Sequence, residues 1–306
     1  PKHIMALTTL GIKNLYVKKN PKIIFFGTGD EIVDYKNKYI SNWQVRNSNN
    51  HYITSFSKSL HYQIIDGGVI KDSEQRKLKE KLKKSLKSDI DIFVTSGAIS
   101  AGKFDFIPEL IKKSGSIPGI KVDKGAKLLA GSDKEKVTEG LDGLRERLEE
   151  YYKLGARFAK WRAVYSISSE HPSEQCIKSN AHALARYAAL VQEAKMVPIV
   201  EPEVLMDGDH TIDKCYDVTS RVLAECYKEL AIHNVNLKGT VLKPNMILPG
   251  ANCKQKATTE EIAKKTLECL KKNMPTAVPG VAFLSGGQSE VEATKNLNSI
   301  NKSVFA

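Results

Sequence analysis

The chain has 306 residues, of which 41% are hydrophobic and 27% are charged, and its formal net charge is +12. This composition is typical of a globular protein and excludes a collagen-like or disordered chain. No apolar run approaches the roughly 20 residues that are needed to cross a bilayer, which argues against a membrane protein. The opening residues, PKHIM, have neither an initiator Met nor a signal-peptide pattern, so we expect the chain to start inside a longer parent sequence.

The positive charge suits two kinds of partner. Basic proteins often bind nucleic acid, but here the lysines are scattered and the aromatic-basic interleaving of an RNA-binding sheet is missing. An enzyme that handles phosphorylated anions also benefits from positive charge, and we favour that interpretation. The five cysteines form no Cys-x-x-Cys pair, which indicates reduced cytoplasmic thiols rather than a zinc site or a disulfide framework.

The first 115 residues predict a βαβαβ segment. Strands are expected at residues 22–26, 62–66 and 90–95, with helices at 48–59 and 74–86 and a further helix beginning near Phe106. Small residues follow the first and third strands, as Gly27-Thr28-Gly29-Asp30 and Ser96-Gly97-Ala98. Such turns let a ligand approach the backbone, and a following helix N-terminus favours anions. Ordinary turns explain these residues equally well.

The second half contains five short apolar runs, each the length of a buried strand, which end at Lys121, Lys160, Glu201, Lys243 and Ser285. The steps between these residues are 39, 41, 42 and 42, so one βα unit recurs at nearly constant length. Amphipathic stretches with the spacing of helices lie between these runs, at residues 141–154, 173–194, 212–232 and 260–272. Strict alternation of this kind predicts a parallel sheet with right-handed crossovers.

Each of these five polar residues is expected at the C-terminal end of its strand, where the active sites of (β/α)₈ barrels are built. Any one of them alone is most simply an ordinary loop residue. Because all five residues recur at nearly the same interval along the chain, together they predict a shared site on one face of the sheet.

Residues 116–302 resemble the class I fructose-bisphosphate aldolases. The resemblance rests on motifs that follow one another with conserved spacing: IPGIKVDKG, GLDGL, ARFAKWR, ARYA, VPIVEPEVL, LKPNM, FLSGGQSE and NLNSIN. It implies that Lys243 forms a Schiff base with the substrate ketone and that Glu201 transfers protons. Lys160 would lie beside them, and Glu203 would belong to the same catalytic set.

The resemblance also implies where the substrate phosphates bind. Lys121 and Arg162 would contact the phosphate far from the ketone, and Ser285, Gly286 and Gly287 the nearer one. The chemistry demands an unprotonated amine, although a free lysine has a pKa of about 10.4. Burial and a second cation both favour the neutral amine. The iminium then takes up the electrons of C–C cleavage without a metal, and no histidine triad at zinc-ligand spacing is visible.

Several parts of the aldolase pattern have no counterpart in this chain. They are the first two strands, with an Asp that acts on the substrate hydroxyl, the eighth strand, with a phosphate-binding Arg, and a C-terminal tail that ends in Tyr. Five of eight βα units are therefore matched, and we expect cleavage to be absent or very weak. Asp30 or Asp66 could replace the missing Asp only if a composite barrel closes around them.

Residues 3–113 resemble the molybdopterin molybdenumtransferases. The motifs are ALTTLGI, IIFFGTGDEIV, VRNSNNHY, DGGVIKD and TSGAISAGKFDF. This resemblance implies a molybdopterin site near six residues: Thr28, Asp30, Glu31, Ser48, Ser96 and Asp105. Asn47 and Lys103 stand where acids are frequent in that family, which argues against metal insertion.

We therefore predict two α/β parts, a molybdopterin-transferase-like fragment at 1–115 and an aldolase-like fragment of a (β/α) barrel at 116–306. Three strands from the first and five from the second could close a composite (β/α)₈ barrel. The leading hypothesis is impaired Schiff-base aldolase chemistry on fructose 1,6-bisphosphate or dihydroxyacetone phosphate, without a cofactor. A non-catalytic composite scaffold and molybdenum insertion remain alternatives, and a homo-oligomer remains open.

Overall fold

A computed structural model describes residue 9 and residues 21–59, 63–71, 74–86, 88–96 and 117–304. Contacts divide the chain into two compact units, Pro1–Gly115 and Ser116–Ala306. Each unit has its own parallel sheet, and neither sheet closes into a barrel within the described residues. The α/β character predicted from the sequence is therefore confirmed, whereas the described strands show no closed barrel.

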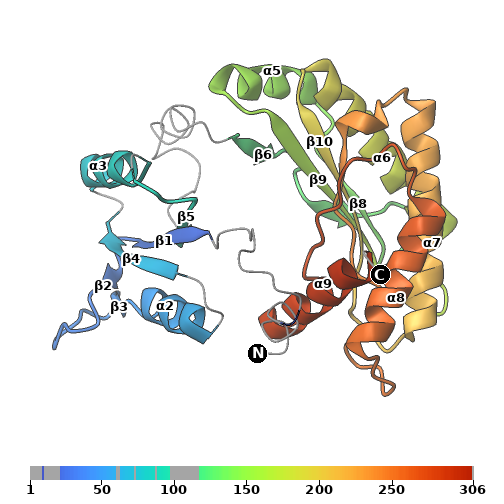
Figure 1. Cartoon of the computed structure of the whole chain (residues 1–306). Coiled ribbons are helices and arrows are strands. Elements are labelled where there is room, and N and C mark those ends of the chain that lie inside the picture. The colour runs from blue at the N-terminus through green and yellow to red at the C-terminus, as the bar shows by residue number, and fades with distance from the viewer. Residues whose placement is uncertain are drawn as a thin grey trace. The chain divides into compact units, whose positions relative to one another are not determined.

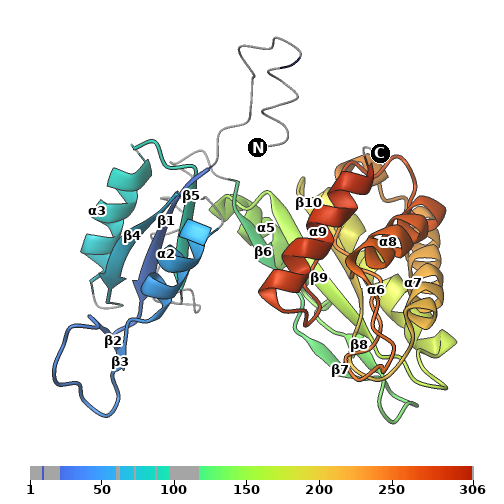
Figure 2. The ribbon, with the colours of Figure 1, turned by 60° about the horizontal axis from the view of Figure 1, so that its bottom comes forward.

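The sheet of the N-terminal unit has three parallel strands in the order β4-β1-β5. Helices α2 and α3 lie on opposite faces of this sheet (Figures 1 and 2). The bounds are β1 Lys22–Thr28, α2 Asn49–Ser59, β4 Gln63–Ile70, α3 Gln75–Leu86 and β5 Ile92–Ser96. A short parallel pair, β2 Ile32–Val33 and β3 Val45–Arg46, follows β1.

Strands β1 and β4 run longer than the sequence predicted, whereas β5 is one residue shorter than the strand predicted at residues 90–95. β1 continues through Gly27 and Thr28, which pair with Val69 and Ile70 of β4 after a register shift. Because glycine and threonine end the apolar run, the pattern placed the strand end at Phe26. The expected helix near Phe106 lies outside the described residues.

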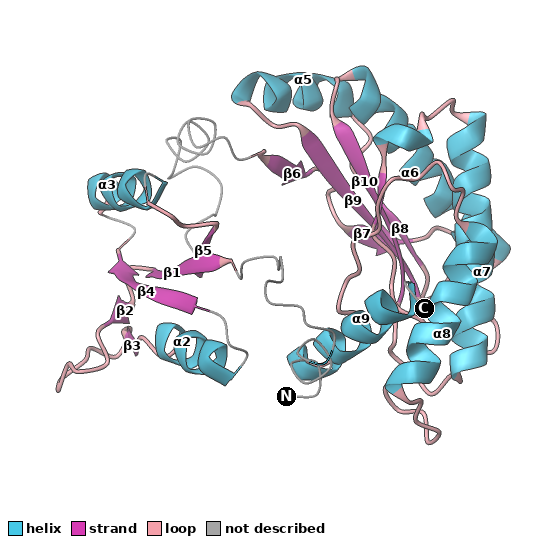
Figure 3. Ribbon diagram, in the orientation of Figure 1, coloured by secondary structure: helices cyan, strands magenta, loops and turns pink. Residues whose placement is uncertain are grey.

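The sheet of the C-terminal unit has four parallel strands in the order β11-β10-β9-β6, and Val281 adds a parallel bridge to Leu242. Figure 3 shows these strands beside the helices of the same unit. The strands are β6 Gly119–Lys121, β9 Phe158–Tyr165, β10 Val197–Val204 and β11 Val241–Leu242. A separate antiparallel hairpin pairs β7 Ala126–Leu128 with β8 Lys136–Thr138.

Two polar residues that were expected at strand ends lie inside their strands. Lys160 is followed by five further residues of β9, and Glu201 by three of β10. The prediction of their position was wrong because it took the first polar residue as the end of each apolar run. Both strands continue past it, and Lys160 and Glu201 face one side of the sheet.

The helices of this unit agree closely with the predicted ranges. Helix α7 spans Ile212–Ile232, as predicted. Thr211 is its N-cap residue, and the Thr211 side chain accepts a hydrogen bond from the backbone amide of Lys214. Serine and threonine at this position satisfy backbone donors that have no partner within the helix. The other helices with predicted ranges are α5 Leu144–Leu154, α6 Glu174–Glu193 and α8 Thr259–Asn273. No range was predicted for η1 Leu237–Gly239 or α9 Glu290–Val304.

The main core lies between α6 and strands β9 and β10. Ala159, Trp161 and Tyr165 of β9 are fully buried, and the Trp161 ring lies 5.5 Å from the Tyr187 ring of α6. The Tyr187 hydroxyl donates to the carbonyl oxygen of Ala159 at 2.6 Å. All five cysteines are free and buried, and no helix among the described residues is long and apolar enough to cross a membrane.

Candidate active site

The polar residues of the C-terminal unit gather on the face of the sheet that α6 does not cover. Side chains alternate along a strand, so Lys160 and Arg162 point away from the buried face of β9 that carries Trp161. In the parallel register Arg162 lies beside Glu201, and Lys121 lies beside Lys160. Neighbouring strands therefore present these side chains on one face.

Glu201 is the centre of this group. Its side chain is 3% exposed, and its two carboxylate oxygens bind two different lysines. Lys243 Nζ donates to Oε1 at 2.7 Å, and Lys160 Nζ lies 2.9 Å from Oε2 as an ion pair without hydrogen-bond geometry. Oε2 therefore keeps acceptor capacity for a further donor.

Asp123 joins Lys121 to the same group, although it was not among the residues predicted from the sequence. Its side chain is 2% exposed, with Lys121 Nζ at 2.7 Å and Lys160 Nζ at 3.8 Å. It also accepts hydrogen bonds from the backbone amides of Gly125 and Arg162. Its position two residues after Lys121, in the IPGIKVDKG motif, was the available signal. The structure thus links four of the predicted residues through two buried carboxylates.

Arg162 and Glu203 form a second pair on this face. The Arg162 side chain is 44% exposed, and its guanidinium donates to the carboxylate of Glu203, whose side chain is 6% exposed. The hydrogen bond to Glu203 raises the pKa of Arg162, and burial opposes that effect. The exposed part of this fixed guanidinium is suited to binding an anion such as phosphate.

Ser285, Gly286 and Gly287 form a turn after the strand-like segment at Val281. Gly286 and Gly287 have φ angles of +62° and +89°, a conformation that side chains rarely adopt. The Ser285 carbonyl accepts hydrogen bonds from the backbone and side chain of Gln288. Within the described residues, no hydrogen bond or ion pair joins Ser285 to Lys243 or Glu201, so the structure does not bring this predicted residue into direct contact with them.

The predicted molybdopterin residues lie in the N-terminal unit at the end of β1 and the start of α2. Thr28 is buried at the end of β1, and Asp30 and Glu31 are exposed in the turn that follows. Ser48 is exposed just before α2, and Ser96 ends β5. Asp105 lies outside the described residues.

Asn50, in the first turn of α2, belongs to the same region and was not predicted from the sequence. It is fully buried, and its amide nitrogen donates to Asp66 and to the Gly68 carbonyl. Its Oδ1 atom is buried without a hydrogen-bond partner in the structure. Such an atom is costly unless a ligand or water donates to it.

The C-terminal face carries the groups that amine chemistry needs. Lys243 can transfer a proton to Glu201 over 2.7 Å, which frees its amine to attack a carbonyl carbon. Lys160 places a second positive charge 2.9 Å from the other oxygen of the same carboxylate. Lys121 and Arg162, both about half exposed, supply positive charge at the edge of the group.

Comparison with known sequences matches both units. Residues 99–305 match the family described as fructose-bisphosphate aldolase class-I, and residues 24–134 match a probable molybdopterin binding domain. A probable fructose-bisphosphate aldolase class 1 from Xylella fastidiosa (strain Temecula1) is 55% identical over 195 residues, which are 64% of this chain and 58% of that protein. Fructose-bisphosphate aldolase 4, cytosolic, from Arabidopsis thaliana is 57% identical over 63% of this chain and 49% of its own length.

A solved structure is also similar. A ternary co-crystal structure of fructose-bisphosphate aldolase from Plasmodium falciparum has a TM-score of 0.65 and 40% sequence identity, and covers 83% of this chain and 74% of that chain. The chain spans three-fifths or less of the length of the curated relatives named above. The chain belongs to the class I fructose-bisphosphate aldolase family, whose model matches residues 99–305.

Proposed function

We propose that the C-terminal unit forms a Schiff base between Lys243 and the ketone of a phosphorylated sugar, fructose 1,6-bisphosphate or dihydroxyacetone phosphate. The observation that carries this proposal is the 2.7 Å contact between Lys243 and the buried carboxylate of Glu201. Membership of the class I aldolase family supports the same chemistry.

The reaction begins with the Lys243 ammonium, which transfers one proton to Glu201. The neutral amine then attacks the ketone carbon, and the C–N bond forms as the carbonyl becomes a hydroxyl. Glu201 returns its proton to that hydroxyl, water leaves, and an iminium remains on Lys243. The balance is one ammonium and one ketone giving one iminium and one water. Lys160 holds Glu201 in place during both transfers.

The substrate phosphates are assigned to the cationic and glycine-rich edges of the site. Lys121 and Arg162 keep 54% and 44% of their side chains exposed and are assigned to the phosphate far from the ketone. Ser285, Gly286 and Gly287 are assigned to the nearer phosphate, because left-handed backbone turns present amides to anions. Glu203 positions Arg162 through their ion pair.

Carbon–carbon cleavage is proposed to be slow in this chain. It requires a base on the substrate hydroxyl, and such a base contributes about 10²–10⁴-fold to the rate. The carboxylates on this face, Asp123, Glu201 and Glu203, are each already bound to lysine or arginine. Asp66 accepts hydrogen bonds from Asn50 and Gly68 within its own unit, so it is held locally.

Borohydride trapping tests this proposal. The protein is incubated with dihydroxyacetone phosphate and reduced, and its intact mass is measured. The expected result is one stable adduct per chain, which is lost in Lys243→Met and retained in Lys254→Met, a variant of an exposed lysine. If the folded protein forms no adduct, the Schiff-base proposal is wrong and the alternative of a non-catalytic composite scaffold is favoured.

The N-terminal unit supports molybdopterin binding as a second candidate function. The buried Oδ1 atom of Asn50 has no hydrogen-bond partner in the structure and lies against Gly27 of β1, where an added Cβ atom would come within 2.8 Å of it. A pterin offers amino and ring N–H donors that suit such an acceptor, so the residues fit the group. Asn50 would accept from the pterin, Thr28, Asp30, Glu31 and Ser48 would surround it, and the bound group would supply the dithiolene that ligates molybdenum.

Fluorescence titration with molybdopterin tests the second candidate. Ser48→Ala is expected to weaken binding, whereas Ser303→Ala, an exposed change in α9, is expected to leave binding unchanged. Absence of binding to the wild-type chain would remove this candidate. The relatives named cytosolic and the five free cysteines support a cytoplasmic location for either function.

A further inference from the structure

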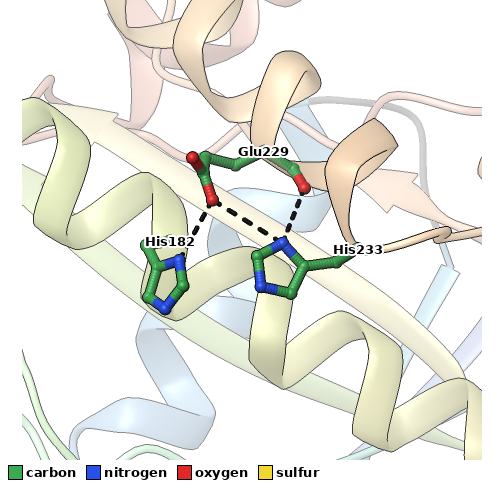
Figure 4. Close-up of side chains that lie close together, drawn as sticks. All are labelled: His182, Glu229 and His233. Carbon is green, nitrogen blue, oxygen red and sulfur yellow. Dashed lines mark hydrogen bonds and ion pairs between the residues drawn. The ribbon is translucent and has the colours of Figure 1, made fainter.

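Three metal-ligating side chains meet on helices α6 and α7, away from the candidate active site. They are His182 of α6, Glu229 in the last turn of α7 and His233, which follows α7 (Figure 4). One possible ligand atom from each residue lies within 4.8 Å of the other two. Within the described residues this is the one group of three or more such side chains at metal-binding distance.

Both imidazole rings face the carboxylate of Glu229. His182 Nδ1 lies 3.1 Å and His233 Nδ1 lies 3.6 Å from the same oxygen, Oε2. Two ligands of a tetrahedral zinc ion at ~2.1 Å are about 3.4 Å apart, so these two distances bracket the separation that zinc requires. Small side-chain rotations would therefore place an ion between the three groups.

The local structure holds two of these side chains in position. Glu229 and His233 are four residues apart at the end of α7, and residues at this spacing face the same side of a helix. The Glu229 side chain is 16% exposed and the His233 side chain 21%, so neighbouring atoms restrict both. His182 is 51% exposed and can move to complete the site.

The surroundings favour a cation and leave room for water. His233 is the C-cap of α7, and the carbonyl groups at a helix C-terminus carry partial negative charge. His233 lines a surface pocket of about 340 Å³, and His182 lines another of about 500 Å³. Arg186 lines both pockets and opposes cation binding, so Glu229 and the helix end must offset its charge.

We propose that His182, Glu229 and His233 bind one divalent transition-metal ion, with zinc as the best match to two imidazoles and one carboxylate. Imidazole and carboxylate ligands suit zinc, and water fills the remaining coordination position. His233 Nδ1 also lies 2.9 Å from the Glu229 carbonyl oxygen, so coordination replaces that hydrogen bond. The ion joins α6 to α7 and takes no part in the lysine chemistry, because α6 covers the Trp161 face of the sheet.

Calorimetric titration with zinc chloride tests the site, on the full chain without a polyhistidine tag and after treatment with EDTA. We expect one zinc ion per chain in the wild type. His182→Gln, Glu229→Gln and His233→Gln should each weaken binding at least about tenfold, since even the loss of outer-shell partners costs 10–100-fold. Circular dichroism checks that each variant is folded. His182→Gln is the variant expected to disturb folding least, because the His182 side chain is half exposed.

The matched control is His171→Gln. His171 also faces one carboxylate, with Nδ1 3.5 Å from Glu135 Oε1, but it lacks a second imidazole. This variant should bind zinc as the wild type does. Equal zinc affinity in the wild type and His182→Gln, or no zinc binding to the wild type, would overturn the proposal. Loss of binding in His171→Gln alone would place the ion elsewhere and overturn it as well.

Discussion

The Nζ atom of Lys243 lies 2.7 Å from Oε1 of Glu201, whose side chain is only 3% exposed. The second oxygen of the same carboxylate lies 2.9 Å from Lys160. One buried anion thus lies between two cations, and a proton can pass from Lys243 to Glu201 without rearrangement of the side chains. This arrangement leads to three tests of the site, and the buried core that supports it leads to two more.

Glu201→Gln should slow Schiff-base formation by about 10²–10⁴-fold, the usual contribution of a positioned proton-transfer group. The amide cannot take the proton from Lys243 or return it to the hydroxyl that leaves as water. The rate is measured by borohydride trapping at increasing times. Glu149→Gln, an exposed change in α5, is the control and should match the wild type. An unchanged rate in Glu201→Gln would exclude the proposed shuttle.

Lys160→Met should slow adduct formation, because the Glu201 carboxylate loses the ion pair that holds its Oε2 atom in place. A displacement of a reacting group by about 1 Å can cost about 10²-fold in rate, so a loss of up to that size is expected. The rate of trapping is compared with that of Lys214→Met, an exposed change in α7. Equal rates in the two variants would show that Lys160 does not position Glu201.

Asp123→Asn should destabilise the C-terminal unit by about 2 kcal/mol, within the range for hydrogen bonds to a charged group, because the buried carboxylate charge is lost. The full cost of a broken buried pair is not expected, because Lys121 is 54% exposed and Lys160 keeps its ion pair with Glu201. The amide keeps the shape of the side chain and can still accept from Gly125. Urea unfolding measures the change against Asp133→Asn, an exposed control. A difference below about 1 kcal/mol would mean that Asp123 is not a structural partner of the lysines.

The buried thiols should be unreactive in the native protein. Burial raises the pKa of Cys176 and Cys226 to about 12 and that of Cys215 to about 11, so all three are protonated at neutral pH. Ellman's reagent should label all five cysteines in urea but these three only slowly in buffer. The exposed position Ser303→Cys supplies a fast-reacting control. Fast labelling of Cys176, Cys215 or Cys226 in native protein would contradict their burial.

The same shifts predict the direction of the alkaline pH dependence. The folded-state pKa of each thiol is above the value of about 8.5 in an unfolded chain. Above that pH the unfolded chain loses protons that the folded chain keeps, so the free energy of unfolding should fall as pH rises. Urea midpoints at neutral and alkaline pH measure this change. A midpoint that rises with pH would have the wrong sign.

Much of the C-terminal fold could be predicted from its sequence because its helices carry clear periodicity and caps. The bounds of α7 were predicted to the residue, and Thr211 marks its start. The ends of β9 and β10 were not predicted. Lys160 and Glu201 end the apolar runs in the sequence, but both strands extend beyond these residues. A polar residue inside a strand and one that ends it have the same local pattern, and only the pairing partners across the sheet distinguish them.

The site was predicted in part for a related reason. Four residues of the site could be identified from their regular interval and from the family motifs: Lys121, Lys160, Glu201 and Lys243. Ion pairs through Glu201 and Asp123 connect them in the structure. Asp123 was missed because a single acid after a lysine looks like a solvated loop residue. His182 and Glu229 are 47 positions apart, so packing of α6 against α7, rather than any local pattern, brings them together.

The most direct test of the central claim is peptide mapping of the borohydride-reduced adduct together with a coupled cleavage assay on the same preparation. We expect the adduct to lie on Lys243 and cleavage of fructose 1,6-bisphosphate to be at least about 100-fold slower than in an intact aldolase, the lower limit for loss of a general base. An adduct on another lysine, or no adduct in folded protein, would contradict the assignment of Lys243. Turnover equal to that of an intact aldolase would contradict the claim that cleavage is slow.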